Sequence, residues 1–196
     1  MNAITSLHDT DVDIPPAASG ARARILVAAH DLFYREGIRA TGIDRVIAES
    51  GVAKLTFYRH FPSKNELVRE FLDYRHARWM AWFVDALQRH GSTSKALVPA
   101  LAEWFSDAGF RGCAFINSVG ELGATLPDVN AIARRHKADM ADAIAKLLPP
   151  SSRRRLLATD LATAVDGAII RAQYEGDPKP ALRSLKRICK ALLASA

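Results

Sequence analysis

The sequence has few of the residues from which most catalytic and metal sites are built. Its only cysteines, Cys113 and Cys189, are too few for a metal cluster or a disulfide framework. The six histidines show no metal-ligand spacing, and the chain contains no glycine-rich phosphate-binding loop. We therefore expect no catalytic residue, no metal ion and no cofactor, and we interpret both cysteines as buried, reduced thiols.

Long apolar runs are also absent. No uninterrupted apolar segment reaches the ~18 residues that a membrane-spanning helix needs. The start of the chain contains Asp9, Asp11 and Asp13 without lysine or arginine, so it lacks the basic region of a signal peptide. We expect a soluble, cytoplasmic protein with no membrane partner, in which residues 1–18 form a flexible tail.

The alternation of apolar and polar residues that marks strands is missing as well. Apolar residues instead recur at helical spacing through most of the chain. We therefore predict an all-α fold, with a three-helix N-terminal domain at residues 19–66 and a larger helical domain at residues 67–196. A chain of 196 residues, 49% of them hydrophobic, is long enough to bury both cores.

What the sequence does contain is a surplus of positive charge. The net charge is +6, and because the first 20 residues carry three aspartates and no cation, the rest of the chain carries +9. A basic surplus suits a polyanionic partner such as a nucleic acid, although many other proteins share it.

Residues 41–64 have the sequence TGIDRVIAESGVAKLTFYRHFPSK, which predicts two short helices joined by a glycine-containing turn. Thr41 and Asp44 have the spacing of a capping box at the start of the first helix. Ser63 and Glu66 repeat that spacing at the start of a following long helix. Two short helices of this kind, the second basic and aromatic, are typical of a helix-turn-helix.

Residues 21–70 resemble, without a gap, the N-terminal domain of TetR-family transcriptional regulators. The resemblance is specific because the spacing of three helices and both turns agrees together. It is carried by Arg24, Ile25, Leu26, Ala28, Ala29, Leu32, Phe33, Gly37, Thr41, Ile47, Ala48, Gly51, Val52, Lys54, Thr56, Phe57, Tyr58, His60, Phe61, Ser63 and Lys64. The rest of the chain fits this family in length and helical pattern only.

The resemblance implies DNA contacts, chiefly to the backbone. The positions that match contacting residues of the family are Thr41, Lys54, Thr56, Tyr58, His60 and Lys64. The chemistry of the second short helix adds Leu55 and Arg59, since a helix fits the major groove and its outward side chains meet base edges or phosphates.

Two positions depart from the common family pattern. Ala53 stands where a capping serine or threonine is frequent, so about 1 kcal/mol of helix capping is expected to be missing. Leu55 stands where glycine is common. It has two alternative positions, one packed inward with Phe57 or Phe61 and one projecting towards the DNA groove.

The region after residue 63 predicts further helices. A long one, at residues 63–90, is expected to join the DNA-binding module to the following domain. Pro127 fits the first turn of a later helix. The expected outer face of that helix is basic and contains Arg134, Arg135 and Lys137.

The larger domain has the aromatic side chains and isolated polar groups of a ligand cavity. The family resemblance implies such a pocket, whereas the alternative is that the aromatic residues pack a core and the polar groups reach solvent. The candidate ligand-binding residues are Trp79, Trp82, Phe83, Trp104, Phe105, Phe115, Asn117, Glu121 and Asp166.

The last two helices are predicted at residues 152–174 and 178–194. Their adjacent apolar faces either complete the core of the monomer or form a four-helix contact with a second copy. The family resemblance, whose members dimerise in this way, favours the homodimer.

The function predicted from the sequence is therefore that of a ligand-responsive, DNA-binding transcriptional regulator. We expect a repressor that binds a palindromic double-stranded operator as a dimer and is released by an unknown small-molecule effector. An alternative from a different class is an all-α small-molecule-binding or scaffold protein whose N-terminal helices make protein contacts. A helical enzyme using Cys113 is a remote third, because no histidine or aspartate partner is evident.

Overall fold

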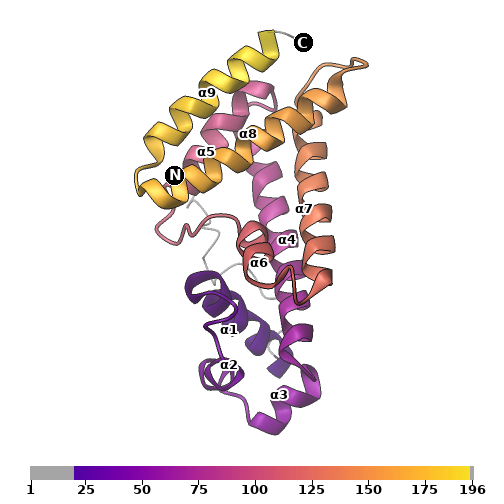
Figure 1. The fold of residues 1–196 in the computed structure, drawn as a ribbon, viewed down its shortest axis with the longest axis vertical. Coiled ribbons are helices and arrows are strands. Elements are labelled where there is room, and N and C mark those ends of the chain that lie inside the picture. The colour runs from indigo at the N-terminus through magenta and orange to yellow at the C-terminus, as the bar shows by residue number, and fades with distance from the viewer. Residues whose placement is uncertain (1–19, 195–196) are drawn as a thin grey trace. The chain divides into compact units, whose positions relative to one another are not determined.

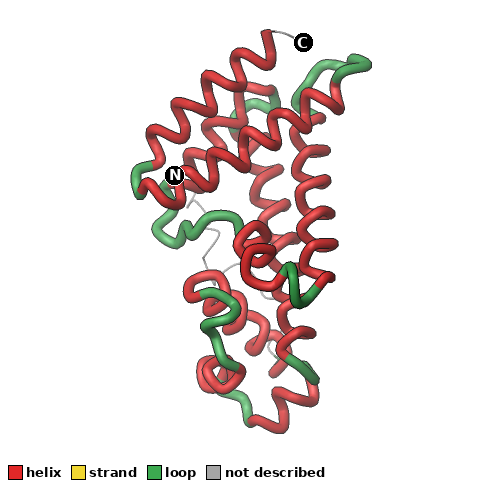
Figure 2. Tube along the Cα trace, viewed as in Figure 1, coloured by secondary structure: helices red, strands yellow, loops and turns green. Residues whose placement is uncertain are grey.

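The structure is a computed structural model that describes residues 20–194, so the tail expected at residues 1–18 lies outside the described chain. Every regular element of the described residues is a helix (Figure 1, Figure 2), which confirms the all-α prediction. The helices are α1 (Ala21–Glu36), α2 (Ile43–Ser50), α3 (Lys54–His60), α4 (Lys64–Arg89), α5 (Leu97–Phe105), α6 (Ala114–Leu122), α7 (Pro127–Ala145), α8 (Arg154–Glu175) and α9 (Pro178–Ala194). A short 3-10 turn, η2 (Ser94–Ala96), precedes α5.

Glycine, proline and a capping serine mark three helix limits of the structure. After α1, Gly37 has a φ of 90° and donates its N–H to the carbonyl of Phe33 at 3.1 Å. Helix α7 begins at Pro127, where the missing N–H needs no partner. At the start of α4, the backbone N–H of Glu66 donates to Ser63 Oγ at 3.2 Å, so the predicted cap is confirmed.

The chain forms two compact units. The first unit consists of the described residues up to Ala77 together with Ala114–Ala133. It contains α1, α2 and α3, the start of α4, the whole of α6 and the start of α7. The second unit consists of Arg78–Cys113 and the described residues from Arg134 onwards. It contains the rest of α4, the whole of α5, the rest of α7, and helices α8 and α9. Helices α4 and α7 therefore contribute residues to both units.

The core of the first unit is aromatic. Phe57 of α3 and Phe61, which directly follows this helix, are 0% and 1% exposed. Phe33 of α1 meets Phe71 of α4 edge-on, with ring centroids 5.4 Å apart. Leu55 is 75% exposed, so the alternative in which it packs inward is wrong. The reason is helical geometry: Phe57 and Phe61 are four residues apart and share a face, whereas Leu55 is two residues from Phe57 and lies on the opposite side.

The capping box predicted at Thr41 is also wrong. The residue before α2 is Gly42, and no side chain caps this helix. Thr41 is instead 1% exposed, and its hydroxyl donates to the carbonyl of Gly37 at 2.8 Å. The side chain thus satisfies a carbonyl at the end of α1, because such carbonyls have no partner within the helix.

A buried cation joins α4 to α1 in the first unit. Arg75 is 1% exposed, its guanidinium carbon lies 4.0 Å from the ring centroid of Tyr34, and its Nη1 donates to His30 Nε2 at 3.3 Å. Because arginine can only donate, Nε2 accepts and the proton of the neutral ring is on Nδ1. That N–H donates to Asp31 Oδ1 at 2.9 Å. The cation is therefore held both by a hydrogen bond and by a cation–π contact.

In the second unit, α8 and α9 pack against each other (Figure 1). Helix α8 buries Leu161, Val165 and Ile169, and α9 buries Ala181 and Leu185. Small residues among these apolar positions allow the two helices to approach closely. The pair leaves its opposite sides, which carry charged and apolar side chains, open to solvent.

Two expectations from composition can be compared with the described residues. Cys113 and Cys189 are both buried and form no disulfide, which confirms the interpretation of buried thiols. None of the described helices combines the length and hydrophobicity needed to cross a membrane.

We predict that His30→Ala lowers the free energy of unfolding by about 2–4 kcal/mol, because it removes an acceptor from a buried guanidinium and leaves space in an aromatic core. Urea denaturation measures the change. The matched control is His60→Ala on α3, at a half-exposed position, for which a loss below about 1 kcal/mol is expected. Equal losses for the two variants would contradict the role assigned to Arg75 and His30.

Candidate functional site

Helix α3 has one buried side and one exposed side. Phe57 fixes the helix to the core, while Lys54, Leu55, Tyr58 and Arg59 are exposed. Thr56 and His60 are half-buried at the edges of the exposed side. The structure thus brings six of the predicted DNA-binding residues onto one short helix, with a mixture of charged, hydroxyl and apolar groups that can meet phosphates and base edges.

Lys54 has a partner that a phosphate can replace. Its ammonium lies 3.2 Å from Asp44 Oδ1 on α2, and the two side chains are 66% and 84% exposed. An ion pair this exposed contributes little to stability, so exchanging the carboxylate for a DNA phosphate has a small cost. Ala53 precedes α3 without a side-chain cap, as the sequence predicts.

Thr41 and Lys64 lie outside α3. The hydroxyl hydrogen of Thr41 is already engaged with Gly37, as described above. Lys64 is half-buried at the start of α4, and its ammonium lies 6.0 Å from the ring centroid of Phe33. Burial lowers the pKa of Lys64 below its usual value, and the carboxylate of Glu121 opposes this shift.

Glu121 of α6 holds the connection between α1 and α2. Its Oε2 accepts a hydrogen bond of 2.7 Å from the backbone N–H of Arg39. Its Oε1 would lie 3.4 Å from a Cβ placed on Gly37. The two partners are 82 residues apart in sequence, and no local signal could have shown this contact. The carboxylate predicted to meet a ligand is therefore bonded within the first unit.

The aromatic residues predicted to line a pocket divide between the two units. Five of them gather in the second unit and contact one another, namely Trp79, Trp82, Phe83, Trp104 and Phe105. Phe110, another aromatic residue expected at the cavity, and His136, which sequence reasoning missed, join this cluster. Phe115 and Asn117 lie on α6 in the first unit, where Phe115 contacts His76 edge-on.

Two polar atoms in this aromatic cluster are unusual. The indole N–H groups of Trp79 and Trp104 are buried and have no hydrogen-bond partner among the described residues. The two rings meet at a centroid distance of 5.5 Å. A buried donor without an acceptor is unfavourable by about 1–3 kcal/mol. A ligand that brought a hydrogen-bond acceptor to these N–H groups would remove this cost and bind more tightly.

The predicted ligand-binding Asp166 is in an ion pair. Its Oδ1 lies 2.5 Å from the ammonium of Lys137, which also contacts Cys113 Sγ at 3.4 Å. Burial alone would lower the pKa of Lys137, but Cys113 and Asp166 outweigh it and hold this pKa above its ordinary value. The expectation that Lys137 belongs to an exposed basic face is wrong, because this long-range pair draws its side chain inward, where it is 23% exposed.

The chain is similar to known bacterial regulatory proteins that carry a helix-turn-helix. Residues 25–71 fit the family model described as bacterial regulatory proteins, tetR family. Over 145 residues the chain is 31% identical to the HTH-type transcriptional repressor Rv3405c of Mycobacterium tuberculosis. This alignment covers 67% of this chain and 69% of that protein. Over 86 residues it is 33% identical to the HTH-type transcriptional activator FasR of Mycolicibacterium smegmatis, with 44% and 39% covered.

A solved structure resembles the chain over nearly its whole length. It is that of SCO4454, a TetR-family transcriptional regulator from Streptomyces coelicolor. The TM-score is 0.79 and the identity 29%, and the alignment covers 90% of this chain and 96% of that chain.

Proposed function

Because the chain belongs to the TetR family of bacterial transcriptional regulators, we propose that it is a repressor that binds a palindromic operator as a homodimer and is released by a small molecule. Residues 19–66 bind DNA, and residues 67–196 bind the effector and dimerise. Repression is favoured over activation because Rv3405c, named a repressor, matches 145 residues of the chain, whereas the activator FasR matches 86. The relatives reported above are named as regulators, so the chain acts in the cytoplasm without catalysing a reaction.

The single observation that carries the DNA-binding role is the exposed side of α3. A helix whose core side is fixed by Phe57 and whose outer side presents Lys54, Leu55, Tyr58 and Arg59 is suited to the major groove. The proposed DNA-contacting residues are Lys54, Leu55, Thr56, Tyr58, Arg59, His60 and Lys64. Thr41 is left out because its side chain is buried and donates to Gly37. A scaffold role for the same helices is disfavoured by the family membership.

We predict that Tyr58→Ala and Lys64→Ala each weaken binding to the DNA upstream of the chain's own gene by about tenfold. Lys64→Ala also reduces the slope of log affinity against log salt by about 1, because one phosphate contact is lost. Gel shifts at several salt concentrations measure both effects. Lys190→Ala on α9 is the control with the same charge change, and wild-type protein that retards no such DNA at low salt would contradict the role.

The proposed dimer contact lies on α8 and α9. These helices expose large apolar side chains that the core of the monomer does not use, with exposures of 59% for Leu156, 44% for Ile170, 71% for Tyr174 and 44% for Ile188. Apolar side chains concentrated on one helix pair favour an interface with another chain. A second copy, related by a two-fold axis, places the same residues opposite one another.

We predict that Ile188→Glu converts the dimer to a monomer, since it would bring two carboxylates into an apolar contact around the two-fold axis. Sedimentation velocity at micromolar concentration reports the change. Val84→Glu is the matched control, because Val84 of α4 is 38% exposed and lies outside the proposed contact. A wild-type chain that sediments as a monomer at every concentration would rule out the dimer.

The effector is proposed to bind at the aromatic cluster of the second unit. The unpartnered indole groups of Trp79 and Trp104 favour a flat, apolar molecule that carries a hydrogen-bond acceptor such as a carbonyl oxygen. The proposed ligand-binding residues of the second unit are Trp79, Trp82, Phe83, Trp104, Phe105 and Asp166. Phe115, Asn117 and Glu121 belong to the first unit and are not part of this proposed site. Helix α4, which carries Trp79 in one unit and Arg75 in the other, is the element through which binding would reach the DNA-binding helices.

All three tryptophans of the chain lie in this cluster, so selectively excited tryptophan fluorescence reports on it alone. We predict that 9-fluorenone, which has a carbonyl, binds about three- to tenfold more tightly than fluorene, which has the same shape without it. Trp104→Phe should remove this difference, whereas Trp82→Phe should keep it. If neither compound changes the emission at its solubility limit, the proposed effector site is wrong.

A further inference from the structure

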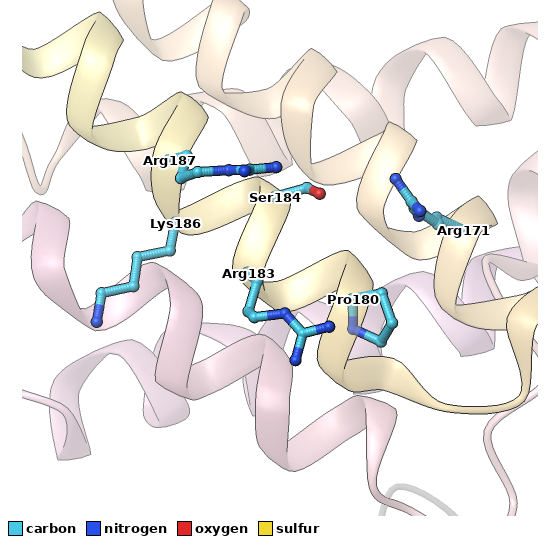
Figure 3. A pocket seen from close by; sticks show the side chains of 6 residues that line it. All are labelled: Arg171, Pro180, Arg183, Ser184, Lys186 and Arg187. Carbon is cyan, nitrogen blue, oxygen red and sulfur yellow. The ribbon is translucent and has the colours of Figure 1, made fainter.

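A second concave site lies between α8 and α9, and it shares no residue with the aromatic cluster or with α3. It has a volume of about 530 Å³ and is lined by Arg171, Pro180, Arg183, Ser184, Lys186 and Arg187 (Figure 3). This volume falls within the range of about 300–1,000 Å³ that is usual for small-molecule sites. Four of its six lining residues are cations, and none is a carboxylate.

The charge of this pocket is poorly balanced. Arg171 forms an ion pair with Glu175, with Nε 2.7 Å from Oε1. No carboxylate of the described residues forms an ion pair with Arg183, Lys186 or Arg187. The whole of α9 has the sequence PKPALRSLKRICKALLA, with five cations and no acidic residue. A hollow lined by charges of one sign concentrates counter-ions of the other sign.

The arrangement of the side chains favours several phosphate groups over a single anion. Figure 3 shows Arg187 of α9 extending towards Arg171 of α8, with the Ser184 side chain between them. Arg183 lies beside Pro180, and Lys186 points away from these groups at the edge of the pocket. Each guanidinium offers a planar fork of donors that matches two phosphate oxygens. A carboxylate has only two oxygens to accept these donors, whereas linked phosphates present more oxygens and more negative charge.

We propose that this pocket binds a small molecule that carries a pyrophosphate or adjacent phosphate groups. Arg171, Arg183 and Arg187 hold the phosphate oxygens, and the Ser184 hydroxyl donates to one of them. Pro180 supplies an apolar wall for the rest of the molecule. The site is distinct from the proposed DNA and effector sites, and its assignment does not depend on either of them.

The position of the pocket also relates it to the proposed dimer. Arg171 follows Ile170, and Arg187 precedes Ile188, both of which belong to the exposed apolar side chains of α8 and α9. An anion in the pocket would therefore neutralise positive charge next to the proposed contact between copies. Anion binding would in this way favour dimerisation, provided that the proposed dimer exists.

The test is isothermal titration calorimetry of the full chain with inorganic pyrophosphate at low ionic strength. We expect saturable binding with one site per chain. The double variant Arg183→Gln, Arg187→Gln should weaken it by about tenfold or more, because two guanidinium contacts are lost. The control is Lys179→Gln, Lys190→Gln, which removes the same charge from exposed positions of α9 outside the pocket and should change the affinity less than about twofold.

Two further ligands identify the source of the phosphate groups. Adenosine diphosphate that binds more tightly than pyrophosphate would support an organic phosphate, with the nucleoside against Pro180, and equal affinities would support free polyphosphate. A short duplex without an operator that competes with pyrophosphate, and is weakened by the same double variant, would assign the surface to nucleic acid and overturn the proposal. Equal weakening in both double variants, or heats that do not saturate, would overturn it as non-specific attraction. Circular dichroism of each variant confirms that the helices are retained.

Discussion

The guanidinium of Arg75, buried between His30 and Tyr34, is the contact on which the architecture depends. A cation taken out of water is strongly unfavourable unless hydrogen bonds and an aromatic face replace the solvent. Here α1 supplies both, so α4 cannot slide or rotate against α1 without breaking them. Helix α4 is thus a wall of the DNA-binding core as well as the helix that continues into the second unit.

The same unit holds the turn between α1 and α2 by one local contact and one contact distant in sequence. Thr41 closes the end of α1, and Glu121 of α6 holds the backbone of Arg39 between α1 and α2. The start of α2 is therefore set by the loop before it and by α6. Since α3 follows α2 directly and is fixed by Phe57, the exposed side of α3 has an orientation determined by the whole first unit.

The sequence was sufficient for those features that depend on neighbours along the chain. Gly37 and Pro127 mark helix ends because their backbone restrictions are local. The inner side of α3 was left open between two positions of Leu55, and only the folded chain decides it. It was insufficient where the partner is remote. The pairing of Lys137 with Asp166 and that of Glu121 with Arg39 join segments whose proximity only the folded chain creates. The phosphate pocket was missed for the same reason, because Arg171 and Arg187 belong to different helices.

The exposure of Leu55 has a consequence for how this protein can evolve. No core residue depends on that side chain, which projects from the side of α3 opposite Phe57. Under the proposed DNA contacts, stability and target choice would be determined by different residues of one seven-residue helix. Under the proposed DNA contacts, a substitution at position 55 would change which bases the helix prefers in the DNA groove. It would leave the buried side of α3, and so the fold, unchanged. If Leu55 meets DNA as proposed, duplicated copies of such a gene could diverge in the operators they bind through substitutions at this position, while the buried side of α3 stays unchanged.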